Sequence, residues 1–239
     1  MAKSFWTVQP ATIIWGSQAK SGTCQEKEML ELVIFDADGV LFDSTESNTA
    51  YYNAIFARVG EPPMSLLEEK AGVFMAAPQV FDLRAGGDPE RIARMRDVAR
   101  ALDATPFFNL LRPFPSLRSF LLEVKRSYRI GLATNRSATI PAIIDYLGLT
   151  DVFDVIASVR DKVKPKPAPD ILELCLKRAG VASANGVYVG DSETDRIASE
   201  AARLNFIGIG DRVDHPNLIA RLDQLPAALK RFFSLKLDI

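Results

Sequence analysis

The sequence has little histidine and cysteine, and this scarcity narrows the chemistry that the protein can use. Its one histidine, His215, stands in a polar Asp-His-Pro-Asn segment. A catalytic triad or a multi-histidine metal site would depend on that residue, and a histidine in such a loop is usually just solvated. The two cysteines, Cys24 and Cys175, match no metal-binding or redox spacing. Nothing indicates a disulfide framework, so we expect a reduced, cytoplasmic location.

The composition also gives no sign of nucleic-acid or membrane partners. The net charge is −1, so there is no overall basic field that would attract nucleic acid or an acidic membrane surface. No apolar run is long enough to cross a bilayer, and residues 1–28 contain no continuous apolar segment typical of a signal peptide. With 48% hydrophobic residues in a chain of 239, there is ample material for a core. The length suits one large domain, or one domain that carries a smaller insert.

Short apolar runs rich in β-formers alternate with helical patterns along most of the chain. The runs predict strands over residues 32–35, 130–134, 154–158, 187–190 and 206–209. The patterns between the later runs predict helices over residues 137–147, 170–179 and 192–204. Because the strands are apolar throughout rather than at alternate positions, they indicate a parallel sheet covered by helices on both faces. The predicted fold class is therefore α/β, with a doubly wound parallel sheet.

Residues 45–112 interrupt this alternation, because they contain no convincing strand. A helix that ends at Gly60 and a second helix over residues 88–102 flank a stretch, 61–87, that we interpret as a loop. We therefore expect residues 45–112 to form a helical domain inserted into a core made of residues 30–44 and 113–239. The prolines of Arg-Pro-Phe-Pro-Ser at the end of the insert suit a hinge or stiff linker. Residues 1–29 are interpreted as an ordered N-terminal extension of unknown role.

Polar residues follow the predicted strands at the points where the strands end. The carboxyl ends of parallel strands lie at one edge of a sheet, where such folds bind ligands. The residues concerned are Asp36, Asp38, Thr134, Asn135, Lys164, Lys166, Asp191 and Asp195. Four carboxylates at one edge would repel each other, and a hard divalent cation such as Mg²⁺ removes that cost. An ion with a lysine beside it would accept a negatively charged group, and we expect this group to be phosphate.

The two carboxylates after the first strand suit two different roles in phosphoryl transfer. Asp36, at the strand tip, is well placed to attack phosphorus and form an aspartyl-phosphate. Asp38 would then protonate the leaving oxygen and later activate water. Structural alternatives exist for other residues: Ser192 and Asp195 have the spacing of a helix capping box, and Asp43 with Ser44 suits the start of the first inserted helix.

Four ordered motifs resemble those of the haloacid dehalogenase-like superfamily, in the branch of phosphoglycolate phosphatases and β-phosphoglucomutase. They are FDADGVLFDS, LATN, KPKPAPD and VGDSETD, and they lie within about residues 30–210. The resemblance implies a Rossmann-like core and a helical C1-type cap at the position of the insert. It implies that Asp36, Asp191 and the main-chain carbonyl of Asp38 hold Mg²⁺, and that Thr134 and Lys166 bind phosphoryl oxygens.

The site residues that we predict are catalytic, substrate-binding and metal-binding. The predicted catalytic residues are Asp36, Asp38, Thr134 and Lys166. Thr134, Asn135 and Lys166 are predicted to bind substrate. Metal binding is predicted for Asp36, Asp38, Asp191 and Asp195. The choice of Lys166 over Lys164 depends on the family pattern alone.

The leading hypothesis is a Mg²⁺-dependent phosphatase that acts on a small phosphorylated metabolite, with phosphoglycolate favoured by its frequency in the family. A sugar phosphomutase of the β-phosphoglucomutase type and a non-catalytic phosphate-binding protein are the alternatives. Haloacid dehalogenases lack the second aspartate of the first motif, so Asp38 argues against dehalogenation. Arg84, in the insert, either contacts substrate on closure or is simply solvated. The sequence does not indicate the oligomeric state.

Overall fold

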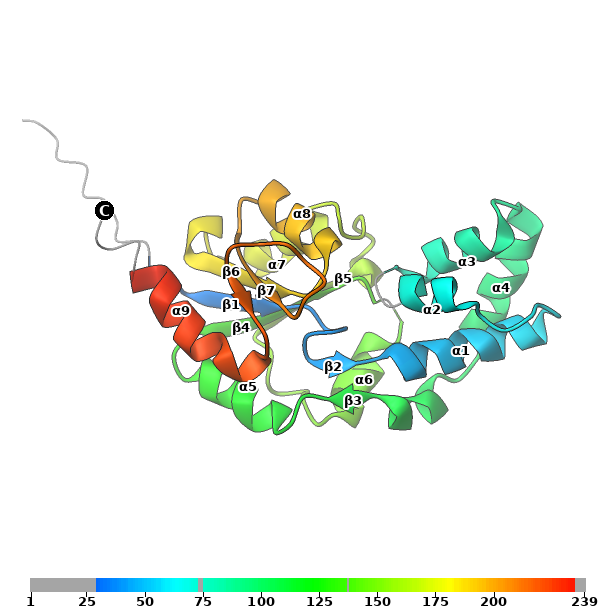
Figure 1. Cartoon of the computed structure of the whole chain (residues 1–239), viewed down its shortest axis with the longest axis horizontal. Helices are drawn as coiled ribbons and strands as arrows, with labels where there is room; N and C mark the ends of the chain where they lie inside the picture. Colours follow the sequence, from blue (N-terminus) through cyan, green and yellow to red (C-terminus); the bar gives the residue numbers. More distant parts are fainter. Residues whose placement is uncertain (1–28, 73–74, 137, 235–239) are drawn as a thin grey trace, which may run out of the picture.

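The computed structural model describes residues 29–72, 75–136 and 138–234, and residues 1–28 of the expected N-terminal extension lie outside them. A sheet flanked by helices forms one part of the molecule, and a group of helices lies beyond one edge of that sheet (Figure 1). None of the helices in these three segments is both long enough and apolar enough to cross a membrane.

The main sheet has six parallel strands in the order β5-β4-β1-β6-β7-β8. Their bounds are β1 Leu32–Phe35, β4 Arg129–Thr134, β5 Val155–Ser158, β6 Gly186–Gly190, β7 Asn205–Ile209 and β8 Leu218–Ile219. The first five correspond to the predicted strands. The sequence did not indicate β8, because two residues are too few to form a pattern. β1 lies between β4 and β6, so the order of strands reverses beside it, which is where ligands bind in such sheets.

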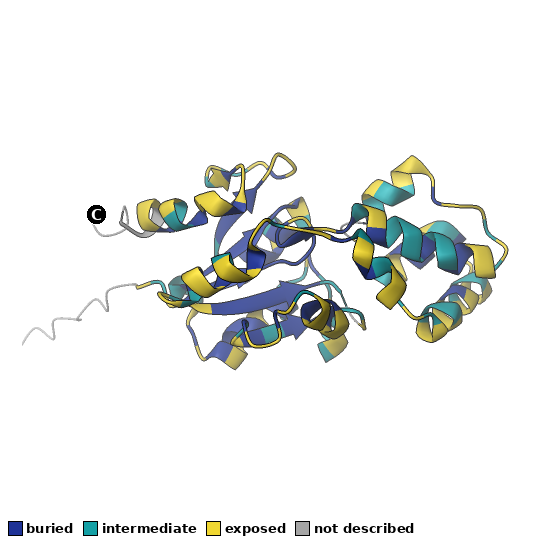
Figure 2. Ribbon diagram, turned by 90° about the horizontal axis from the view of Figure 1, so that it is seen from below, coloured by how far each residue is buried: buried dark blue, intermediate teal, exposed yellow. Residues whose placement is uncertain are grey.

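Helices cover both faces of the sheet, and this confirms the α/β, doubly wound fold class (Figure 2). Val33 and Phe35 face one cluster, which holds helices α5, α6 and α9, whereas Leu32 and Ile34 face another, which holds α7 and α8. The helices are α5 Leu117–Lys125, α6 Ile140–Tyr146, α7 Asp170–Ala179, α8 Glu193–Ala201 and α9 Leu225–Ser234. Short 3₁₀ turns are η2 Val159–Asp161, η3 Ser183–Asn185 and η4 Leu222–Gln224. Burial on both faces explains why the strands are apolar throughout.

The inserted segment is helical and has its own hydrophobic cluster. Its elements are α1 Thr45–Arg58, α2 Leu66–Gly72, α3 Ala77–Ala85, α4 Pro89–Ala101 and η1 Thr105–Leu110. The cluster contains Tyr52, Ile55, Phe56, Met64, Val80, Phe81 and Met95. The prediction of a loop over residues 61–87 was wrong, because α2 and α3 lie there. These helices are 7 and 9 residues long. Helices this short are stabilised by tertiary packing, such as that of Phe81 in α3, rather than by local sequence.

The two segments that connect the sheet domain to the insert lie next to each other. β2 Phe42–Asp43 pairs with β3 Arg112–Pro113 as an antiparallel two-stranded ribbon. The segment that we expected to be a linker therefore begins as a short strand, and the Phe114 amide adds a 2.9 Å hydrogen bond to the Leu41 carbonyl. We propose that this ribbon is the boundary between the two domains, with the insert spanning residues 45–112.

Candidate active site

The predicted site residues lie at the carboxyl ends of the parallel strands. Asp36 follows β1, and its amide donates a 2.9 Å hydrogen bond to the Val189 carbonyl, which ties the strand tip to β6. Thr134 is the last residue of β4, and Asp191 follows β6 directly. Asp195 lies in the first turn of α8. The strand ladder thus places three separate loops next to one another, as the sequence predicted.

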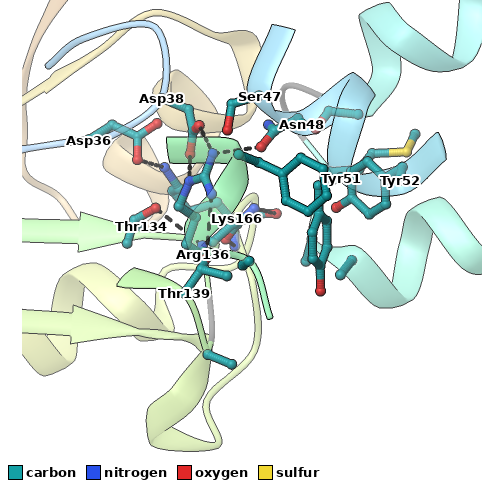
Figure 3. A pocket seen from close by; sticks show the side chains of 18 of the residues that line it. Asp36, Asp38, Ser47, Asn48, Tyr51, Tyr52, Thr134, Arg136, Thr139 and Lys166 are labelled. Carbon is teal, nitrogen blue, oxygen red and sulfur yellow. Dashed lines mark hydrogen bonds and ion pairs between the residues drawn. The ribbon is translucent and has the colours of Figure 1, made fainter. Parts of the chain in front are cut away.

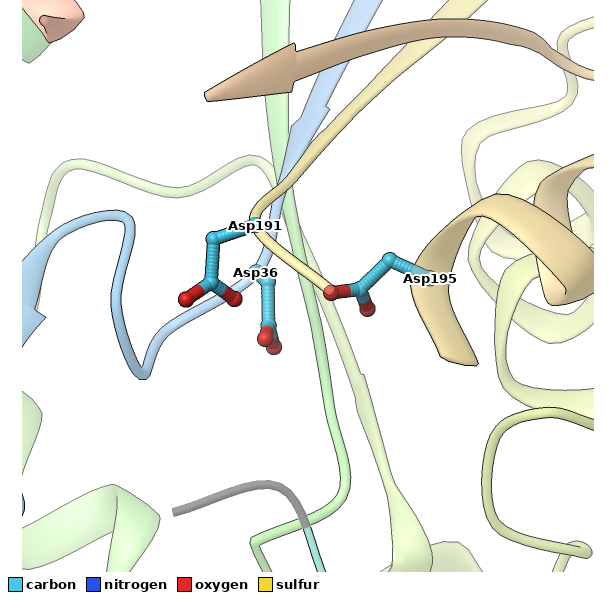
Figure 4. Close-up of side chains that lie close together, drawn as sticks. All are labelled: Asp36, Asp191 and Asp195. Atoms are coloured by element: carbon cyan, nitrogen blue, oxygen red, sulfur yellow. The ribbon is translucent and has the colours of Figure 1, made fainter. Parts of the chain in front are cut away.

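Three carboxylates form a buried cluster (Figure 4). One oxygen from each of Asp36, Asp191 and Asp195 lies within 4.8 Å of the others. Burial raises the pKa of Asp36 well above its ordinary value, and the charge of Asp195 adds to this effect. Burial, together with the neighbouring Asp195, also raises the pKa of Asp191 to about 7. This concentration of negative charge needs a compensating cation.

Part of that compensation comes from Lys166, whose ammonium is almost fully enclosed. Its Nζ lies 2.8 Å from Asp36 Oδ1 and 2.6 Å from Asp195 Oδ1. Burial by itself would lower the pKa of Lys166, but the two carboxylates overcome this and raise that pKa above its ordinary value. Lys164, by contrast, is exposed. The structure therefore places Lys166, and not Lys164, beside the strand tip.

Asp195 has both of its carboxylate oxygens engaged by protein groups. Its Oδ1 accepts hydrogen bonds from Lys166 Nζ and, at 2.9 Å, from the Tyr188 hydroxyl. Its Oδ2 accepts from the Ser192 amide at 3.1 Å, and the Ser192 hydroxyl accepts from the Asp195 amide at 3.3 Å. The capping box is thus present, and it orients the carboxylate that holds Lys166. Tyr188 was missed because it stands in the middle of an apolar strand.

Thr134, which ends β4, and Asn135, which follows it, have different partners. The Asn135 side chain accepts a 2.7 Å hydrogen bond from the Lys166 amide and donates one of 3.1 Å to the Lys166 carbonyl. Asn135 therefore holds the main chain of Lys166 in place. Thr134 is buried, and its hydroxyl accepts a 3.2 Å hydrogen bond from the Arg136 amide. Both residues line the pocket, so either can also reach a bound ligand.

Asp38 has different neighbours from the other carboxylates. Arg136 donates from Nε to Asp38 Oδ2 at 2.8 Å and from Nη2 to Oδ1 at 2.7 Å. The Ser44 hydroxyl also donates to Oδ1. Ser44 does precede helix α1, as expected, but its side chain makes no capping hydrogen bond there. Arg136 was missed, although its position directly after Thr134 and Asn135 was a signal that could have revealed it.

A small cavity separates the sheet edge from the helical insert (Figure 3). Its volume is about 100 Å³. Asp36, Asp38 and Lys166 line it from the sheet domain, and Asn48 and Tyr52 line it from helix α1. Pockets for drug-sized ligands occupy roughly 300–1,000 Å³, so this cavity suits a much smaller molecule.

Arg84 does not line the cavity that lies beside Asp36. It lies in the last turn of α3, where its side chain pairs with Glu68 at 2.8 Å and stacks on the Phe56 ring at 4.3 Å. It is neither a substrate contact in this arrangement nor a solvated loop residue. Its role here is to stabilise the interior of the insert.

The carboxylate cluster fits a hard divalent cation. Asp36 Oδ1 is buried and, apart from its ion pair with Lys166, accepts no hydrogen bond from the described residues. Gly39 allows Asp191 to approach closely, since an added Cβ at Gly39 would lie 1.9 Å from Asp191 Oδ2. Carboxylate oxygens are the ligands that Mg²⁺ prefers. The donor set and the raised pKa values of Asp36 and Asp191 both agree with a cation at this place.

The fold and the acidic strand tips together define an α/β protein with a carboxylate site at the carboxyl ends of its parallel strands. The family described as haloacid dehalogenase-like hydrolase matches residues 33–209, and the chain belongs to this family. The expected family and hydrolase class are thereby confirmed.

Similar proteins agree with this assignment. A phosphoglycolate phosphatase of Cereibacter sphaeroides is 30% identical over 218 residues, which cover 84% of this chain and 99% of the relative. Among solved structures, a subfamily IA hydrolase of Geobacter sulfurreducens is 26% identical with a TM-score of 0.67, over 84% of this chain and 96% of that one. A β-phosphoglucomutase of Clostridium difficile shares the fold, with a TM-score of 0.72 at 20% identity over 86% of this chain and 100% of that one.

Proposed function

We propose that the protein is a Mg²⁺-dependent phosphatase that hydrolyses a phosphomonoester of a small metabolite, in the manner of a phosphoglycolate phosphatase. The observation that carries this proposal is the position of Asp36, which directly follows β1 and lines the cavity, with Lys166 Nζ 2.8 Å from its carboxylate. A nucleophile and a cation are thus adjacent in a space that admits a phosphoryl group. The relatives named phosphoglycolate phosphatase support the choice of substrate class.

In the proposed reaction, Asp36 attacks phosphorus and forms an aspartyl-phosphate while the ester oxygen leaves. Lys166, with the Thr134 hydroxyl and Asn135, binds the phosphoryl oxygens and stabilises the charge that develops on them. Asp38 gives a proton to the leaving oxygen and afterwards takes one from the water that hydrolyses the intermediate. Asp195 and Asn135 hold the side chain and the main chain of Lys166, so the cation is positioned before substrate arrives.

Asp36, Asp191 and Asp195, with the main-chain carbonyl of Asp38, are the groups that would hold Mg²⁺. When bound, the ion would neutralise the negative charge of the clustered carboxylates and of the phosphoryl oxygens. Asp195 has both of its oxygens engaged, by Lys166, Tyr188 and Ser192. Asp191 accepts a 3.2 Å hydrogen bond from Arg212 at Oδ2, and Asp36 pairs with Lys166 at Oδ1. We therefore expect Asp36 and Asp191 to contribute more to affinity for the ion than Asp195 does.

The cavity volume favours a small substrate over a sugar phosphate. A space of about 100 Å³ lined on the insert side by Tyr51 and Tyr52 suits a phosphoryl group with a short remainder. A phosphomutase has to hold a sugar with two phosphoryl positions, for which the helical insert would need to sit further from the sheet.

The scarcity of cysteine keeps the cytoplasm as the predicted location.

Release of phosphate from 2-phosphoglycolate tests the proposal. We expect release that requires Mg²⁺ and stops when a chelator is added. Asp36→Asn should lower kcat at least about 10⁴-fold, as removal of a nucleophile does, while circular dichroism shows an unchanged fold. Retained turnover in Asp36→Asn would exclude Asp36 as the nucleophile. Accumulation of an isomer from a sugar monophosphate, without free phosphate, would indicate the mutase alternative.

A further inference from the structure

Arg136 connects the sheet domain, the insert and the acid-base residue of the proposed reaction. Its guanidinium donates to both oxygens of Asp38 and, at 2.7 Å, to Asn48 Oδ1 on helix α1. It also approaches Thr139 Oγ1 at 3.4 Å and lies 5.7 Å from the centre of the Phe42 ring. The side chain is 13% exposed, and the residue lines the cavity. These contacts place a strongly held cation between the catalytic loop and the insert (Figure 3).

The cavity contains a second cationic position besides the one beside the nucleophile. Among its described lining residues, Lys166 and Arg136 are the cations, and those from helices α1 and α3 are neutral. Lys166 lies against Asp36, so in the proposed reaction it binds the phosphoryl group that is transferred. A second anionic group on a small substrate has Arg136 as its cationic partner in this lining. A guanidinium fork matches a carboxylate in two parallel hydrogen bonds.

The present contacts of Arg136 oppose catalysis by Asp38, because they favour its charged form. A general acid needs an oxygen that carries a proton and faces the leaving group. Here Arg136 occupies Oδ1 and Oδ2 of Asp38 at once. Separation of the pair would make Asp38 available, but separation without a new partner would leave an enclosed guanidinium uncompensated, which is costly. A carboxylate on the substrate removes that cost, because it replaces Asp38 on the same fork.

We infer that Arg136 selects phosphomonoesters that carry a carboxylate next to the ester, and that binding of this carboxylate releases Asp38 for proton transfer. The inference rests on the proposed phosphatase function and adds to it a specificity residue. Arg136 exchanges one carboxylate for another, so it stays paired throughout. Substrate recognition and activation of the acid are then one event. A phosphomonoester without the second charge leaves Asp38 held by Arg136 and is turned over slowly.

Two substrates that differ chiefly in this charge test the inference. 2-Phosphoglycolate and ethyl phosphate have similar size, but the second lacks the carboxylate. We expect the wild-type protein to show a higher kcat/KM for 2-phosphoglycolate. In Arg136→Met the ratio of the two kcat/KM values should fall roughly 10- to 100-fold, the range for a hydrogen bond to a charged group. Arg136→Lys keeps a cation without the fork and should retain an intermediate ratio.

An unchanged ratio in Arg136→Met would overturn the inference. An equal loss on both substrates would overturn it as well, because Arg136 would then act on the shared phosphoryl group or only on folding. Asn48→Asp is a second variant that keeps Arg136 and places a carboxylate at an atom 2.7 Å from Nη2. This carboxylate should compete with the substrate and lower the ratio in the same direction; an undiminished ratio would contradict the inference.

Binding separates this inference from the proposed function. Asp36→Asn, loaded with Mg²⁺, can be titrated calorimetrically with each phosphomonoester, alone and combined with Arg136→Met. We expect tighter binding of 2-phosphoglycolate than of ethyl phosphate, and loss of that preference in the double variant. If the wild-type protein hydrolyses neither compound, the phosphatase proposal fails, and the titration still decides on Arg136. A preference that survives in the double variant would overturn the role of Arg136.

Discussion

Lys166 Nζ donates a 2.6 Å hydrogen bond to Asp195 Oδ1, in a place where the exposed fractions of the two side chains are 3% and 0%. Neither group reaches bulk water, so each depends on the other for compensation of its charge. The other oxygen of Asp195 is held by Ser192 at the start of α8. This chain of contacts connects the capping of a helix to the position of the cation beside the nucleophile.

Asp195→Asn should therefore impair catalysis more than affinity for the ion. The amide keeps the shape but removes the charge that holds Lys166, and we expect kcat to fall about 10²-fold, by analogy with loss of a transition-state donor. Asp191→Asn is the matched variant, because its oxygen has no contact with Lys166. Activity measured against Mg²⁺ concentration should show a larger increase in the required Mg²⁺ for Asp191→Asn. An equal increase in both variants would show that Asp195 contributes as much to Mg²⁺ affinity as Asp191 does.

Gly39→Ala should damage the site without much additional effect on folding. Gly39 has φ +74°, and its added Cβ would lie 1.9 Å from Asp191 Oδ2. Gly60 has φ +78° with nothing within 4 Å of an added Cβ, so Gly60→Ala is the control. Both variants bear the strain of a left-handed backbone, roughly 1–2 kcal/mol. Only Gly39→Ala should also lose activity, measured as kcat at saturating Mg²⁺. Equal activity in the two would show that Asp191 does not need this approach.

The metal-free protein should become less stable as the pH rises toward neutrality. The pKa of Asp191 is raised to about 7 in the folded protein from an ordinary value of 3.8. Between these values the unfolded chain has released a proton that the folded chain keeps, so stability is full below the lower value and is lost as pH rises through the higher one. One proton corresponds to a slope of up to about 1.4 kcal/mol per pH unit.

Urea unfolding with a chelator, from pH 4.5 to 8, checks this expectation. Asp191→Asn cannot release the proton and should show a shallower decline than the wild-type protein. Part of the slope should remain, because burial raises the pKa of Asp36 in the same direction. Addition of Mg²⁺ should restore stability at pH 8. A decline of equal steepness in Asp191→Asn would contradict the assignment to this carboxylate.

Met95→Ala should loosen the helical insert and leave the sheet domain intact. Met95 is fully buried in the cluster of the insert, and Leu121 is fully buried in a separate cluster on the sheet. Loss of either side chain should cost about 2–5 kcal/mol. Amide hydrogen exchange should accelerate in α1, α3 and α4 for Met95→Ala, but in α5 and the neighbouring strands for Leu121→Ala. Acceleration of the same amides in both variants would contradict two separate domains.

Local sequence was sufficient for the elements whose pattern lies within a few residues. Continuous apolar runs identified β1, β4, β5, β6 and β7, because a strand buried on both faces is composed mostly of apolar side chains. Asp36 and Asp191 were found because they interrupt such runs at the strand ends. The gap between strands also led to the prediction that residues 45–112 are an insert. It did not reveal α2 and α3, which are short; α3 is held by packing of Phe81 in the same cluster as Tyr52 and Phe56.

By itself, the sequence determined the five longer strands of the main sheet, which residues stand at their tips, and to which family the chain belongs. Only the tertiary structure decided how those side chains pair. Arg136 and Asp38 are 98 positions apart, and Lys166 and Tyr188 are 22 apart, so no local pattern records either contact. The direction of a side chain at a strand end depends on which neighbours enclose it and compensate its charge. Those neighbours are brought together by the order of the strands and the packing of the insert, which arise from the whole chain at once.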